Sequence, residues 1–189
     1  MRLTETHMQA GATTSDGTVP TPPVSRAILW AAYAIPLCVL PSGLWRIALV
    51  SGWTDWYAVH DWLPGERLYV VSLSLVAQCL ALLALGLVKP WGERLPGWVP
   101  FAGGRTLPVR AVVVPASVGA LLLTALFVYA TVNYFFHIVP PLNDNGEVLP
   151  RSGPGAWALL ACYLPAFAWG PLLAVVTRAY YLRRTRGAR

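Results

Sequence analysis

Four long stretches with almost no charge constrain the fold of this chain more than any other feature of its sequence. They cover residues 27–50, 68–88, 111–136 and 156–177, and their 93 residues include one charged side chain, Arg46. Each stretch has 21 to 26 residues, and a helix that rises about 1.5 Å per residue crosses a bilayer's hydrocarbon layer with about 20. We therefore expect an all-α bundle of four transmembrane helices.

The low number of charges excludes several classes of protein. Only 12% of the 189 residues are charged, whereas about a quarter of a soluble domain is charged because its whole surface meets water. An ordinary soluble enzyme, a disordered protein and a nucleic-acid-binding domain all need more polar surface. If the four stretches were core helices of a soluble protein, each would need a polar stripe on its water-facing side, and none of them has one. We expect a multi-pass membrane protein with no nucleic-acid partner.

Lysine and arginine are distributed unevenly between the two sides that four spans would define. Eleven of these residues belong to the side with both termini and the middle loop. Three belong to the other side: Arg67 and Arg151 in its two loops and Arg46 near the end of the first stretch. The positive-inside rule then places both termini in the cytoplasm. The chain has 13 arginines and one lysine, a usage typical of GC-rich genomes, so we expect a bacterial plasma membrane.

The chain divides into one membrane domain and two tails. Residues 1–25 are rich in Thr, Ser, Gly and Pro and predict a disordered cytoplasmic tail. The four-helix domain covers residues 26–184, and its first helix is expected to be retained as a signal anchor rather than cleaved. Residues 185–189 form a basic cytoplasmic tail. The run Tyr180-Tyr181 with Arg183-Arg184 is expected to extend the last helix into anionic headgroups.

Small residues predict how the helices pack, because helices in a bilayer associate through close backbone approach. The fourth stretch has a small residue at every fourth position, and shorter runs lie on the third and second stretches. We expect the fourth helix to be the central packing element. The residues are Ala158, Cys162, Ala166, Gly170 and Ala174, then Ala116, Ala120 and Thr124, and Ala77 with Ala81.

Prolines interrupt the first and fourth stretches. Pro36 and Pro41 lie in the first and Pro165 and Pro171 in the fourth, so both helices should bend near mid-membrane. Such kinks are usually relieved by neighbouring helices. Paired broken helices also mark substrate sites in transporters, an alternative that stays open.

Few polar side chains lie in the spans. Arg46 is close enough to the end of its stretch to extend outward to the headgroups, with a substrate or counter-ion role as the alternative. Gln78 and Asn133 are expected to form hydrogen bonds between helices rather than bind a ligand. The three cysteines lie in different stretches and predict no disulfide framework.

Acid–base groups collect in the two loops expected outside, residues 51–67 and 137–155. His60, Asp61 and His137 are weak candidates for a metal or catalytic site if the loops meet. Their spacing matches no known metal motif, and we expect neither a metal nor a cofactor.

The middle loop, residues 89–110, predicts a rigid, non-helical segment in the inner interface because it is rich in Pro, Gly and Trp. Its run Lys89-Pro90-Trp91-Gly92-Glu93-Arg94, followed by Pro96, Trp98, Pro100 and Gly103-Gly104-Arg105, resembles uncharacterised small four-helix membrane proteins of actinobacteria. That resemblance implies a plasma-membrane location and brings no activity, cofactor or catalytic residue.

These patterns favour a non-enzymatic accessory or partner-binding membrane subunit. Its partners would be the lipid bilayer and either another membrane protein or a second copy of the chain. The first alternative is a membrane enzyme or metal-dependent protein with its site at His60, Asp61 and His137. The second alternative is a small oligomeric transporter.

Overall fold

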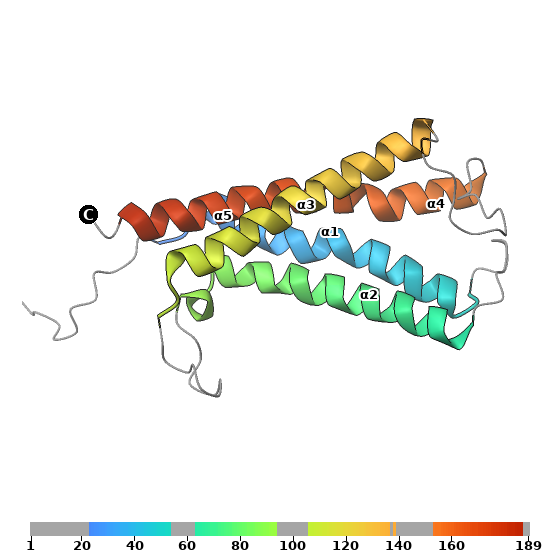
Figure 1. Cartoon of the computed structure of the whole chain (residues 1–189), viewed down its shortest axis with the longest axis horizontal. Helices are drawn as coiled ribbons and strands as arrows, with labels where there is room; N and C mark the ends of the chain where they lie inside the picture. The colour runs from blue at the N-terminus through green and yellow to red at the C-terminus, as the bar shows by residue number, and fades with distance from the viewer. Residues whose placement is uncertain (1–22, 54–62, 94–105, 137, 139–152, 187–189) are drawn as a thin grey trace, which may run out of the picture.

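A computed structural model describes residues 23–53, 63–93, 106–136, 138 and 153–186 (Figure 1). Five α-helices and three short 3₁₀ helices make up most of this part of the chain. The α-helices are α1 (Arg26–Val50), α2 (Pro64–Leu83), α3 (Val109–Phe136), α4 (Pro154–Tyr163) and α5 (Trp169–Arg186). The 3₁₀ helices are η1 (Ala84–Leu87), η2 (Pro90–Gly92) and η3 (Leu164–Ala168).

Four helical segments of the described residues are long and apolar enough to cross a membrane. They are Arg26–Val50, Pro64–Leu87, Val109–Asn133 and Pro154–Thr185. The prediction of an all-α chain with four such segments is therefore confirmed. The structure agrees with a multi-pass membrane protein.

The four segments lie side by side in one elongated bundle (Figure 1). We call the end where α1 begins and α5 finishes the terminal end; η1, η2 and the start of α3 also lie there. Helix α5 packs against α3, α1 and η1, while α1 packs against α2, α4 and η3. Helix α3 crosses the bundle obliquely and packs mainly on α5. The largest fully buried side chains, Ile35, Val176 and Tyr180, come from α1 and α5.

The second helix begins earlier than its apolar stretch suggests. Pro64 occupies the first turn, where its fixed backbone angle suits a helix start. The carboxylate of Glu66 accepts a hydrogen bond of 3.1 Å from the backbone N–H of Leu63. These local signals add a turn before residue 68, the start expected from hydrophobicity.

The fourth stretch, expected to be one helix over residues 156–177, is instead α4, η3 and α5 in succession. Pro165 lies in η3 and has no N–H to donate to the carbonyl four residues earlier. Helix α1, in contrast, continues through Pro36 and Pro41. At the other end, α5 runs to Arg186, two residues into the segment 185–189 that was expected as a basic tail.

The small-residue stripe of the fourth stretch follows the packing surface only in part. Ala166 and Gly170 are buried and Ala158 and Cys162 are half-buried, but Ala174 is exposed, so its predicted packing role was wrong. Four residues advance a helix by about 400°, and the stripe rotates about 40° at each step. The buried side of α5 instead continues through Leu173, Val176, Thr177 and Tyr180.

Gly170 lies where α5 approaches α3 closely. A β-carbon built on Gly170 would overlap the hydroxyl oxygen of Thr124 and lie 3.0 Å from the carbonyl oxygen of Ala120. The absence of a side chain thus lets the two backbones meet.

Candidate functional site

Arg46, the one charge in the predicted spans, is bonded within the bundle. Its Nε donates a hydrogen bond of 3.0 Å to the hydroxyl of Tyr163. Its guanidinium carbon also lies 5.5 Å from the centre of the Tyr163 ring. These contacts join α1 to the end of α4 and hold the guanidinium there, whereas the sequence favoured a side chain directed to the headgroups.

The other two polar side chains singled out in the spans also lie against protein. Nε2 of Gln78 donates to the carbonyl oxygen of Pro36 at 3.3 Å and so joins α2 to α1. Asn133 is half-buried near the far end of α3.

The candidate site in the outer loops cannot be placed, because His60, Asp61 and His137 lie outside the described residues. Among the residues that the structure does describe, no group of three His, Cys, Asp or Glu side chains is arranged to hold a metal ion. The outer-loop site stays a prediction.

At the terminal end, Glu93 joins the middle loop to the last helix. Its Oε1 lies 2.7 Å from Nη2 of Arg183, and its Oε2 lies 3.9 Å from Nη1 of Arg184. Arg183 also donates to the carbonyl of Leu87 at 3.3 Å, and Arg184 donates to that of Leu107 at 3.1 Å. We call Glu93, Arg183 and Arg184 the terminal clasp.

Close backbone contacts support the clasp. The Tyr180 hydroxyl is buried and donates to the carbonyl of Gly92 at 3.2 Å. A β-carbon on Gly92 would overlap the carbonyl oxygen of Gly86, and one on Gly86 would lie 2.6 Å from the ring of Trp91. The start of the middle loop therefore folds against η1, and it includes the 3₁₀ helix η2 where a non-helical segment was expected.

The clasp also corrects the expectation for the end of α5. Tyr180 is only 1% exposed. The Arg183 and Arg184 side chains are 12% and 19% exposed. These groups bond to the protein rather than extend among lipid headgroups, because Glu93 and three carbonyl groups lie within their reach.

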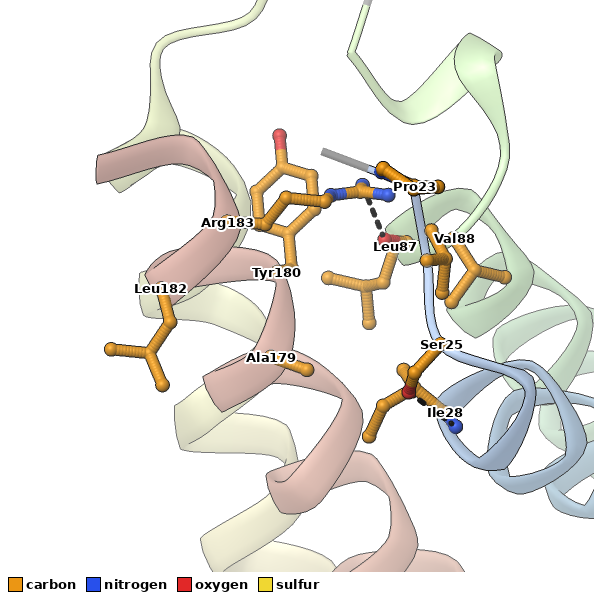
Figure 2. A pocket seen from close by; sticks show the side chains of 10 residues that line it. Pro23, Ser25, Ile28, Leu87, Val88, Ala179, Tyr180, Leu182 and Arg183 are labelled. Atoms are coloured by element: carbon orange, nitrogen blue, oxygen red, sulfur yellow. Dashed lines mark hydrogen bonds between the residues drawn. The ribbon is translucent and has the colours of Figure 1, made fainter. Parts of the chain in front are cut away.

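A small hollow of about 230 Å³ lies beside the clasp, between the start of α1, η1 and α5 (Figure 2). Pro23, Ser25 and Ile28 face Tyr180 and Arg183 across it. Arg183 is its charged lining residue and is already paired with Glu93. The hollow therefore offers no free charge for a ligand.

A larger groove of about 630 Å³ separates α2 from α3. Its lining is almost entirely apolar, with α5 contributing to it and the middle loop forming its terminal-end rim. The residues that define its extent are Leu80 on α2, Trp91 and Leu107 at the rim, Ala111 and Leu126 on α3, and Trp169 on α5. Gly119 also lines the groove, and a β-carbon there would meet only Leu173 Cδ2, at 4.0 Å.

Helix α3 is covered least by the rest of the bundle. Of the 18 most apolar consecutive residues of this span, 6% are buried. The corresponding fraction is 22% in the first span and 28% in the second and fourth. Ser117, Leu121 and Ala125 are exposed on α3 at four-residue spacing. A helix turns by about 100° per residue, which places these three residues on the opposite side of α3 from Gly119 and the groove. We call these three residues the outward face of α3.

The described residues offer surfaces for binding rather than groups for a reaction. The groove is apolar, the outward face carries Leu121 between two small residues, and the charged clasp is neutralised in part by its own contacts. Sequence reasoning missed the groove and the clasp. The sequence held one signal for the clasp. This was Glu93, which is predicted on the same side of the membrane as Arg183 and Arg184.

Comparison with known proteins adds no assignment: no family model, curated protein or solved structure matches the chain. The resemblance to actinobacterial membrane proteins therefore stays a prediction.

Proposed function

We propose that this protein is a non-enzymatic accessory subunit of the bacterial plasma membrane that binds a transmembrane helix of another membrane protein along the outward face of α3. The observation that carries the proposal is the low burial of α3, since only 6% of its most apolar 18 residues are buried by the rest of the chain. Helices in a bilayer gain stability from close packing, which α3 obtains mainly from α5.

The composition of the outward face suits a helix partner. Ser117 and Ala125 are small and lie on either side of Leu121, so a second helix can approach the α3 backbone closely. At the same four-residue spacing α2 exposes Ser72, Val76 and Leu80, so only one of its three side chains is small. Close approach is therefore favoured on α3.

The use of polar groups within the spans supports binding over catalysis or transport. Arg46 is bonded to Tyr163 and Gln78 to Pro36. Intramembrane polar groups that serve transport line a substrate or ion pathway. These two instead connect neighbouring helices of the same chain.

The proposal includes an orientation with both termini in the cytoplasm. Six described basic side chains lie at or near the terminal end, together with one described carboxylate, Glu93. The basic residues are Arg26, Lys89, Arg110, Arg178, Arg183 and Arg184. The positive-inside rule favours the cytoplasm for this end.

Affinity purification in mild detergent tests the proposal. The tagged wild-type chain should retain a specific membrane protein, and Ser117→Trp should lose it because the bulky ring blocks close approach. Ser72→Trp is the matched control, since Ser72 is an equally small, exposed residue at the corresponding distance from the start of α2. Equal retention by the two variants, or no specific protein retained by the wild type, would contradict the proposal.

A further inference from the structure

The groove between α2 and α3 runs through only part of the membrane depth. It begins at Leu107 and Trp91 on the terminal-end rim and reaches Trp169, near the middle of the last span. On α3 it extends from Ala111 to Leu126, about 22 Å along the helix axis. On α2 and η1 the lining runs only from Leu80 to Leu87, about 10 Å at the terminal end of the second span.

The walls of the groove match a hydrocarbon chain. Leu80, Leu122, Leu126 and Leu173 present aliphatic side chains, and Gly119 leaves open space between them. Helices α2 and α3 make few contacts with each other, so the groove opens sideways, toward the bilayer. A transmembrane helix would continue across both leaflets, whereas one acyl chain ends near the middle of the membrane.

The charge at the rim specifies the headgroup. Among the side chains that the structure describes, the terminal end has six basic groups and one acidic group, whereas the opposite end has Arg46, Arg67 and Glu66. Arg184 is bonded to the carbonyl of Leu107, a rim residue. Arg110 is exposed in the first turn of α3, at the level of Ala111 but on the side of the outward face. Basic side chains at this level attract anionic lipids, with about 1 kcal/mol for each Lys or Arg.

From this arrangement we infer that the groove is a binding site for one acyl chain of an anionic phospholipid, whose headgroup lies at the positively charged terminal end, at the level of Leu107 and Arg110. The site is separate from the outward face of α3, so both can be occupied together. If the terminal end is cytoplasmic, the lipid comes from the inner leaflet.

Native mass spectrometry of the purified full chain tests this inference. The protein is incubated with phosphatidylglycerol or with phosphatidylcholine of identical acyl chains, and bound lipids are counted. The wild type should retain one phosphatidylglycerol in preference to phosphatidylcholine. Arg110→Gln should lower that preference about fivefold. Arg67→Gln, which removes an exposed arginine at the opposite end, should leave it unchanged.

Two variants fill the groove from different positions and separate binding from folding. Gly119→Leu and Leu122→Trp should both lose the retained lipid, while Gly43→Leu on α1, where an added β-carbon meets nothing within 4 Å, should keep it. The melting temperature of each variant shows whether it is folded. The inference is overturned if the wild type retains both lipids equally or neither, or if a folded groove-filling variant retains phosphatidylglycerol as the wild type does. A protein found in place of lipid in the groove would also overturn it.

Discussion

Gly170 of α5 lies so close to Thr124 of α3 that a β-carbon on the glycine would overlap the threonine hydroxyl. Gly170→Leu should therefore destabilise the bundle by about 2–3 kcal/mol, because neither backbone can move apart without losing its other contacts. Thermal unfolding in detergent measures this, with an expected fall of about 5–10 °C. Gly43→Leu, in open space on α1, serves as the control. Equal melting temperatures for the two variants would show that α3 and α5 do not meet at Gly170.

The terminal clasp should depend on the charge of Glu93. Glu93→Gln keeps the shape of the side chain but leaves Arg183 and Arg184, which are mostly buried, without their carboxylate. Leaving a buried charge without its partner is costly, so we expect the free energy of unfolding to fall by about 1–3 kcal/mol. Arg178→Gln, at an exposed position of the same helix, should change stability by less than about 0.5 kcal/mol. If the two variants unfold at the same temperature, the clasp contributes nothing.

Gly92 in the middle loop should not tolerate a side chain. A β-carbon there would overlap the backbone carbonyl of Gly86, and a backbone atom cannot rotate away as a side chain can. Gly92→Ala should cost at least about 2 kcal/mol and release the Tyr180 hydroxyl from its bond to Gly92. Gly65→Ala on α2, where the added carbon meets nothing within 4 Å, should be neutral or stabilising. Thermal unfolding compares the two, and a stable Gly92→Ala variant would contradict the contact.

Arg46 and Tyr163 should be energetically coupled. A double-mutant cycle with Arg46→Gln and Tyr163→Phe removes the hydrogen bond of 3.0 Å between them. We expect a coupling energy of about 0.5–2 kcal/mol in detergent unfolding, since contacting pairs in proteins and interhelical bonds in membranes fall in this range. Additive effects would indicate that Arg46 extends to the headgroups, as the sequence alone favoured.

The sequence predicted the elements that depend on composition alone. Four almost uncharged stretches give four apolar helical segments, because each must form its backbone hydrogen bonds within itself in lipid. Gly170, noted in the sequence as one of a stripe of small residues, lies close to α3, whereas Ala174 is exposed because the stripe rotates around the helix. The four-residue spacing assumes one continuous helix, so it does not predict the break at η3, where the helix register changes.

The terminal clasp and the groove depend on distant parts of the chain. Glu93 meets Arg183 and Arg184 across 90 positions, and the groove forms because α2 and α3 are held apart while α5 joins α3. Hydropathy predicts where each helix lies in the sequence, but it does not predict which pairs of helices are in contact. The Tyr180 hydroxyl was therefore expected among headgroups, although in the fold it reaches the carbonyl of Gly92.

The central claim is that α3 presents its outward face to another protein, and site-directed photocrosslinking in native membranes tests it most directly. A photoreactive amino acid at Leu121, 70% exposed in the middle of α3, should give a crosslinked product of one defined mass. The same group at Leu75, 58% exposed in the middle of α2, should give none. Products from both positions in equal yield, or from neither, would contradict a partner-binding role for α3.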